Sequence, residues 1–313
     1  MNRKKFLASL IGLMMVLSFS LINSSSFAAE MSAGEAIAAA IANGEIVDLT
    51  VLIAENYPAH WPTHNQFQRW TFNWFQPIKG KYENNLAQSV FPYYGQRMII
   101  DEHTGTQIDF PAHFIPPKGS GLPFEGEAGS LTGSNYPLER QMGPVDVIDV
   151  RSILDKAENG KSPAITVDMI KDWEKKNGEI KPGEVVAFYS SYSDKYYKPF
   201  PEGNRLAFDP LITKTAPGWP APTPEVMEYL HSKGVWHVAT DGPSMGPVEA
   251  GQPTHVAGLK YGMSWTELCT NLGKLPARGA YFISLHAKIV DGSGGIARAI
   301  AIKSKGVKGV GEQ

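Results

Sequence analysis

Short runs rich in β-branched and aromatic residues recur along almost the whole chain, and they constrain its fold more than any other feature of the sequence. The last two runs are joined by the glycine-rich residues 291–295, a connection that suits an antiparallel hairpin. We therefore expect many strands within one sheet. The runs span residues 46–53, 97–101, 145–150, 184–190, 235–240, 280–290 and 296–302.

Helical stretches lie between some of these runs. Residues 33–43 are rich in alanine and are followed by Gly44, residues 166–176 end before a glycine at 178, and Thr223-Pro224 opens a helix that Gly234 closes. Two of these helices lead directly into a strand. The pattern predicts an α/β fold, with a mixed β-sheet flanked by helices in a single domain that spans residues 29–313.

The first 28 residues have the composition of a secretory signal peptide. Three cations at positions 3–5 precede an apolar run over residues 6–22, and small residues follow around Ala28. A run of this length is at the lower limit for a membrane span, so an uncleaved anchor is the alternative. We expect an exported protein, periplasmic or extracellular, without stable membrane association after cleavage.

The charge balance and the cysteine content limit the partners and the means of stabilisation. The 313 residues hold 29 Lys and Arg against 31 Asp and Glu, a net charge of −2, which argues against a nucleic-acid partner. Cys269 is the single cysteine of the chain. An exported chain without a disulfide must be stabilised by its core, and 42% hydrophobic residues suffice for one.

Residues 103–113 hold the densest group of chemically active side chains. Four of them share odd numbering, so in an extended chain they would point to one side: His103, Gln107, Asp109 and His113. A straight strand would separate the first from the third by about 20 Å, too far to share an ion. Gly105 offers a bend, and Pro111 ends strand pairing. A bent segment of this kind is a metal half-site; the alternative is a chance grouping on a half-exposed strand.

The same stretch resembles the signature H-x-G-T-H-x-D-x-P-x-H of the cyclase family of metal-dependent hydrolases, which includes kynurenine formamidase-like and isatin hydrolase-like proteins. Every fixed position matches except Gln107, which stands where the signature has its second histidine. A later part of the family pattern is matched by His255 and Glu267, and Asp241 and Ser244 resemble a turn that the family places after a strand. The resemblance implies the swivelling β/β/α-like architecture of that family.

The resemblance also implies a role for each matching residue. His103, Gln107, Asp109 and His255 would hold the metal, with His113 as general base and Glu267 as a second catalytic group. Because the amide of Gln107 is a neutral and weaker donor than imidazole, we favour one divalent ion, Mn²⁺ or Zn²⁺, over a binuclear centre.

A metal ion in such a site lowers the pKa of bound water and polarises a carbonyl oxygen. The implied reaction is hydrolysis of an amide or ester bond in a small-molecule substrate, with cyclic amides, lactones and N-formyl amides as candidates. A metal-dependent binding protein without turnover is an alternative function.

A second alternative is a serine hydrolase, because residues 242–246 fit G-x-S-x-G with Ser244 as nucleophile. The context disagrees, because Pro247 and the sequence at 251–253 argue against the helix that should follow. Four other histidines show no metal spacing and are predicted to be surface or core residues: His60, His64, His231 and His237. His286 is left unassigned. Cys269 is predicted to be a small buried apolar side chain.

Two long irregular segments, residues 57–95 and 191–222, are rich in aromatic residues or in proline, glycine and tyrosine. The aromatic rings of the first, among them Trp61, could wall a substrate site or pack in the core or a subunit interface. These segments and the family resemblance favour a homo-oligomer. The composition of these segments does not indicate which substrate is bound.

Overall fold

The computed structural model describes residues 31–75 and 92–312. The chain divides into two compact units, Met1–Ala42 and Asn43–Gln313. Helix α2 (Ala33–Asn43) forms where the alanine-rich stretch predicts it. The predicted signal peptide lies outside the described residues. Within the described ranges, no helix has the length and apolar character that a membrane crossing requires.

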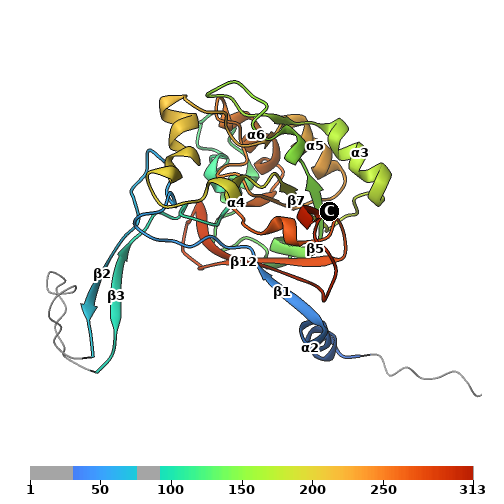
Figure 1. Cartoon of the computed structure of the whole chain (residues 1–313). Coiled ribbons are helices and arrows are strands. Elements are labelled where there is room, and N and C mark those ends of the chain that lie inside the picture. Colours follow the sequence, from blue (N-terminus) through green and yellow to red (C-terminus); the bar gives the residue numbers. More distant parts are fainter. Residues whose placement is uncertain (1–30, 76–91, 313) are drawn as a thin grey trace, which may run out of the picture. The chain divides into compact units, whose positions relative to one another are not determined.

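An eight-stranded mixed sheet organises the second unit, in the order β1-β12-β11-β5-β7-β9-β10-β4. Figure 1 labels β1, β5, β7 and β12 of this sheet. An additional pairing of β12 with β4 closes the sheet on itself, so it is barrel-like. Strands β5, β7, β9 and β10 run parallel, and the other pairings are antiparallel. The bounds are β1 (Gly44–Asp48), β4 (Gln107–Asp109), β5 (Met142–Asp149), β7 (Val185–Tyr189), β9 (His237–Thr240), β10 (Ser264–Glu267), β11 (Ala280–His286) and β12 (Gly294–Ser304).

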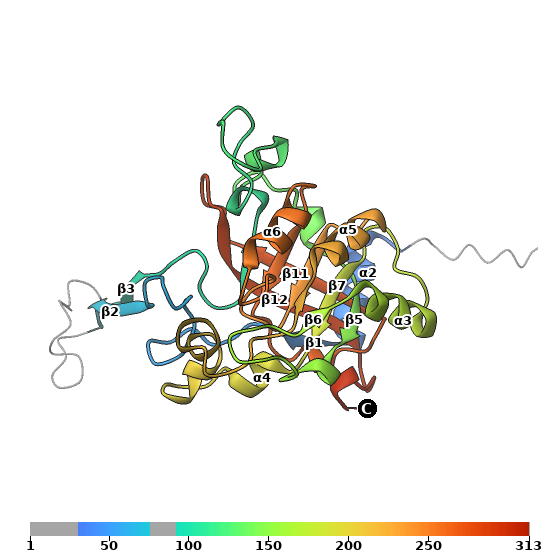
Figure 2. The same ribbon diagram turned by 90° about the horizontal axis from the view of Figure 1, so that it is seen from above.

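Strand β7 is buried along its whole length because its two faces contact different cores. Val186 and Phe188 pack with helices α3 (Val167–Asn177), α5 (Pro224–Ser232) and α6 (Gly251–Leu259), which Figure 2 shows beside the sheet. Val185 and Ala187 pack inside the barrel, where Phe282 of β11 and small residues of β12 meet them. A continuous apolar run is typical of a parallel strand covered on both faces.

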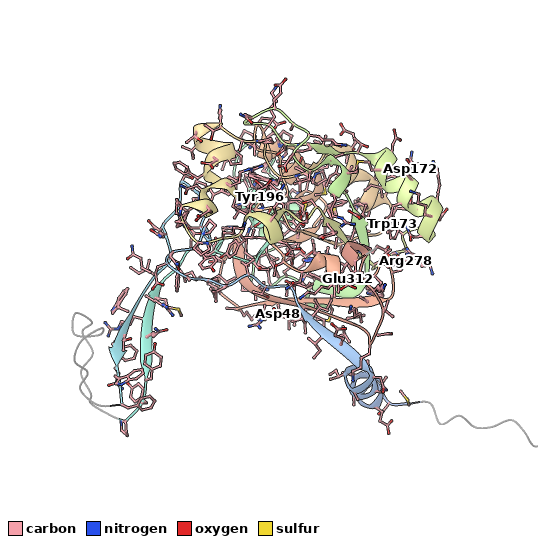
Figure 3. All side chains as sticks on the ribbon, in the orientation of Figure 1. Asp48, Asp172, Trp173, Tyr196, Arg278 and Glu312 are labelled. Carbon is pink, nitrogen blue, oxygen red and sulfur yellow. The ribbon has the colours of Figure 1, made fainter. Side chains whose placement is uncertain are left out.

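Helix α3 ends at Gly178 with φ of 92°, as its sequence predicts. Its Trp173 donates a hydrogen bond to the carbonyl of Val147 and lies under the guanidinium of Arg278, 5.2 Å from the ring centre (Figure 3). Arg278 also forms an ion pair with Asp146 at 2.8 Å. These contacts attach α3 to the sheet near β5.

The remaining elements are short. Strands β2 (Gln68–Asn73) and β3 (Gly95–Ile99) form a two-stranded antiparallel sheet, and β6 (Ala164–Ile165) pairs with β8 (Ala221–Pro222). Helix α4 (Tyr192–Tyr196) follows β7. Single 3₁₀ turns span Pro111–His113, Glu127–Ser130, Leu138–Gln141, Arg151–Ile153, Glu202–Arg205, Leu272–Lys274 and Val310–Glu312, and a π-helical turn spans Asp209–Thr213.

Several secondary-structure predictions are wrong. Pro247 and the sequence at 251–253 were expected to exclude a helix, yet α6 begins at Gly251. Pro253 is tolerated because it occupies the first turn, where backbone N–H groups have no partner within the helix. The predicted strand at 280–290 also ends earlier, at His286. Strands β4 and β10 were not predicted at all.

Candidate metal centre

Strand β4 carries the first half of the candidate site. It pairs with β10 on one side and β12 on the other, and its three residues are buried. Gly105 precedes it with φ of 67°, and a Cβ there would lie 2.9 Å from the side chain of Ile53. Pro111 opens a 3₁₀ turn that ends at His113. The bend and the end of strand pairing therefore lie where the sequence predicts them.

Asp109 is the centre around which the predicted site residues gather. Its Oδ1 lies 3.0 Å from Nδ1 of His103, and its Oδ2 lies 3.8 Å from Nε2 of His113. From the later motif, His255 of α6 places Nε2 3.5 Å from Oδ2 of Asp109 and 3.6 Å from Oε1 of Glu267. Residues more than 140 positions apart thus meet at one carboxylate.

Gln107 joins the two halves of the cluster. Its Oε1 lies 2.6 Å from Nδ1 of His103, and its Nε2 donates to Oε2 of Glu267 at 2.6 Å. All six residues predicted for the site therefore lie together. Two triads of residues share Asp109, and within each triad the potential ligand atoms lie within 4.8 Å of one another. The first is His103, Asp109 and His113; the second is Asp109, His255 and Glu267.

The donor set fits a divalent cation. Oδ1 of Asp109 is buried and has no hydrogen-bond partner, although Nδ1 of His103 is close, because that contact lacks hydrogen-bond geometry. Nδ1 of His103 is instead directed at the amide oxygen of Gln107. Oδ1 of Asp109, Nδ1 of His103 and Oε1 of Gln107 therefore converge, and a divalent cation between them would satisfy all three donors.

Neighbouring groups hold these side chains from outside the cluster. Nε1 of Trp265 donates to Oδ2 of Asp109 at 3.0 Å, and Nδ1 of His255 lies 2.8 Å from the carbonyl of Gly251. The backbone N–H of Met245 donates to Oε1 of Glu267 at 2.5 Å. Such outer contacts fix the orientation of metal ligands.

Burial and the charges of neighbouring side chains shift the pKa values of the site residues in different directions. Burial disfavours the charged form of His103 and of His255, but nearby carboxylates outweigh it and raise their pKa values to about 9 and about 10. Burial lowers the pKa of His113 to about 4, with neighbouring imidazoles adding to the effect. Burial opposes charge on Asp109, yet the surrounding histidines hold its pKa well below the usual range. Burial and Asp109 raise the pKa of Glu267 to about 7.

A cavity of about 380 Å³ opens onto this cluster. Part of its wall is apolar, with Trp61, Phe114 and Leu206 among its residues. His60 and His64 also line it, which sequence reasoning missed because they show no metal spacing. His64 is held by Asp101, whose Oδ2 lies 3.3 Å from its Nδ1. Trp70, from the same aromatic segment, lies in β2 and is not among the residues that line the cavity. Residues 76–91 of that segment lie outside the described residues.

Comparisons with known proteins show to which family this chain belongs. A family model described as "Putative cyclase" matches residues 47–247. An isatin hydrolase of Roseibium aggregatum is 33% identical over 215 residues, which cover 66% of this chain and 74% of that protein. The chain belongs to the cyclase family. A kynurenine formamidase of Erythrobacter litoralis is 26% identical over 206 residues, 65% of this chain and 74% of that protein.

Solved structures extend the comparison of this cyclase-family chain to its fold. An isatin hydrolase bound to the product analogue thioisatinate matches with a TM-score of 0.66 at 25% identity, covering 88% of this chain and 100% of that chain. Isatin hydrolase A from Ralstonia solanacearum matches with a TM-score of 0.67 at 24% identity, covering 88% and 99%. The predicted family, its α/β fold with a mixed sheet, and the enzyme class of hydrolase are confirmed.

The surroundings of Ser244 differ from those of a serine nucleophile. In the described part of the chain its hydroxyl accepts a hydrogen bond from the N–H of Gly246 at 3.2 Å and has no histidine partner. Asp241 of the same turn is buried and accepts hydrogen bonds from Ser190, away from the cluster. The turn instead reaches the cyclase-family site through the Met245 backbone.

The other histidines and the cysteine considered in the sequence analysis contact residues outside the candidate metal centre. His237 is buried in β9 between two hydroxyls, and His231 stacks on Tyr261 at the end of α5. His286 contacts the carbonyl of Gly133 at 2.7 Å. Cys269 is buried and free.

Proposed function

We propose that this chain is a metal-dependent hydrolase that opens an amide or ester bond of a small substrate, cyclic or open. The observation that carries the proposal is the convergence of imidazole, amide and carboxylate groups on Asp109 at the wall of a cavity. The curated relatives support it, since one is named isatin hydrolase and another kynurenine formamidase.

His103, Gln107, Asp109 and His255 would hold one divalent ion, Mn²⁺ or Zn²⁺. When bound, the ion supplies Lewis-acid polarisation of a carbonyl oxygen and lowers the pKa of a coordinated water. A single ion is preferred because Gln107 contributes a neutral oxygen rather than an imidazole. Analysis of metal content per chain distinguishes one ion from the two that the overlapping triads would allow.

His113 is our candidate for the general base. Its low pKa leaves it neutral near pH 7, and its Nε2 lies 3.8 Å from Asp109, beside the other site residues. Nε2 would accept the proton of the attacking water and return it to the departing nitrogen or oxygen. Glu267 would be the second catalytic group, held by the N–H of Met245 and the amide of Gln107.

The cavity supports a small substrate with a flat apolar body. Its described lining residues include aromatic rings and histidines but no lysine or arginine, so the proposed metal ion would be the main positive charge that a substrate meets there. His60 and His64 offer hydrogen bonds to a polar edge of the substrate. Cyclic amides such as isatin and N-formyl anilines are therefore the first compounds to assay, followed by lactones.

Dialysis against a chelator is the deciding experiment. We expect activity to disappear, to return with Mn²⁺ or Zn²⁺, and to fall by roughly 10²–10⁴-fold in His113→Ala while metal content is retained. His231→Ala, which removes a half-buried imidazole of α5 that does not line the cavity, is the matched control and should retain activity. Metal and ligand binding without product in the wild type would favour a binding protein. A serine hydrolase would tolerate the chelator and fail in Ser244→Ala.

We also propose that residues 1–28 are a signal peptide, that residues 29–313 form one exported domain, and that the protein is a homo-oligomer. A row of apolar side chains across the outer sheet supports oligomerisation: Ile46 is 53% exposed and Tyr281 42% exposed, and both pair with Ile302. Light scattering of the purified protein and N-terminal sequencing of the secreted product test these proposals. A monomer, or a chain that retains its first 28 residues, would contradict them.

A further inference from the structure

Ser293 lies where the outer nitrogens of two site histidines meet. Its hydroxyl is 3.2 Å from Nε2 of His103 and 3.5 Å from Nδ1 of His113. The two imidazole rings are nearly stacked, with their centres 4.1 Å apart. The same hydroxyl donates to Oε1 of Glu102 at 2.6 Å. A single oxygen therefore connects two rings of the site with a carboxylate outside it.

The direction of these hydrogen bonds follows from the number of protons available. A serine hydroxyl has one proton, and at 2.6 Å that proton is committed to Glu102, whose carboxylate can only accept. The oxygen must therefore accept from Nε2–H of His103. This hydrogen bond holds Nε2 on the side of Ser293 and turns Nδ1 toward Oε1 of Gln107 and Oδ1 of Asp109, so Nδ1 is the nitrogen that would face a bound ion.

The backbone around Ser293 is fixed well enough to impose this choice. Its carbonyl accepts from the N–H of Phe110 at 3.0 Å, and its own N–H donates to Glu102 at 3.3 Å. The next residue, Gly294, pairs with Asp109, and a Cβ at Gly294 would lie 2.4 Å from Cε1 of His103. The start of β12 is thus in direct contact with the ring.

We propose that Ser293 and Glu102 are positioning residues that orient His103 for metal binding and, through the same hydroxyl, orient His113. This inference rests on the proposed function, because it assigns a partner to a residue that the proposal makes a metal ligand. Neither residue belongs to the signature that led to the site. Nothing in residues 291–295 beyond a flexible turn suggested the role from sequence.

The test measures the affinity of the purified protein for Mn²⁺ and for Zn²⁺ by competition with a chromophoric chelator. We expect Ser293→Ala to weaken binding by roughly 10–100-fold, the range for loss of an outer partner of a ligand histidine. Glu102→Ala should have a smaller effect, and the double variant should be little weaker than Ser293→Ala, because Glu102 acts through the serine. Ser293→Thr keeps the hydroxyl and should restore most of the affinity.

Ser304→Ala, at the opposite end of the same strand, is the matched control and should bind metal as the wild type does. Thermal denaturation of the metal-free proteins separates positioning from folding, because a merely structural role would lower the melting temperature of Ser293→Ala without metal. If that variant does not fold, the Glu102 and threonine variants carry the test.

The inference would be overturned if folded Ser293→Ala bound Mn²⁺ and Zn²⁺ as tightly as the wild type does. If Ser293→Ala does not fold, the same result for folded Glu102→Ala would overturn it. Failure of the wild-type protein to bind either metal would instead overturn the proposed function, and the inference with it.

Discussion

Acidification should destabilise this protein through His237, a buried histidine behind the site. The side chain is 1% exposed, with Nδ1 2.8 Å from the hydroxyl of Ser264 and Nε2 2.8 Å from that of Thr266. No carboxylate contacts it in the described part of the chain, so a proton on the ring would be uncompensated. Burial lowers its pKa from 6.5 to about 3.

The magnitude follows from the difference between the folded and unfolded pKa values. Between pH 6.5 and about 3 the unfolded chain binds a proton at His237 that the folded protein does not bind. Stability from this residue is therefore complete above pH 6.5 and is lost as the pH falls, by about 1.4 kcal/mol per pH unit. At pH 4.5 the accumulated loss is about 3 kcal/mol.

Urea denaturation of the metal-free protein at several pH values between 4.5 and 7.5 measures this loss. His237→Gln keeps polar atoms near the two hydroxyls but cannot be protonated, so its unfolding free energy should fall less steeply with acid, by about 3 kcal/mol over the range. His231→Gln, at the half-buried end of α5, is the control and should change the slope less than His237→Gln does, because His231 is less buried. Equal slopes for the wild type and His237→Gln would refute the reasoning.

Three further substitutions test the packing and the site. In Gly294→Ala the new methyl group would overlap the ring of His103, so metal affinity should fall by at least ~10-fold; an unchanged metal titration would contradict this. Phe282→Ala removes a fully buried ring from the barrel interior and should cost about 3–5 kcal/mol of unfolding free energy in urea, whereas a loss below ~1 kcal/mol would show that the core collapses around the gap. Trp219→Phe removes the hydrogen bond to the carbonyl of Gly246 and should lower the free energy of unfolding by about 1–3 kcal/mol. An unchanged midpoint of urea denaturation would contradict this.

The sequence was most informative where backbone chemistry is local. Gly105 and Pro111 favour a bend and a strand end whatever surrounds them, so the kink of this segment could be predicted from residues 103–113 alone. The run that became β7 is apolar throughout because both of its faces are covered, and such composition identifies a buried strand without knowledge of its neighbours.

Strand β4 is three residues long and extended only because β10 and β12 pair with it on both sides, which no local pattern reveals. Helix α6 was excluded by its proline and glycines, yet packing of Ala257 and Leu259 in the core stabilises it and carries His255 to Asp109. His60 and His64 line the cavity although their spacing indicates nothing.

The sequence by itself therefore determined which residues could bind a metal and how the first segment bends, because those properties belong to single residues and their immediate neighbours. Only the tertiary structure decided how His255 and Glu267 meet Asp109, and that Ser293 lies between His103 and Glu102. Those contacts depend on strand pairing and on burial, which are properties of the whole sheet rather than of any segment.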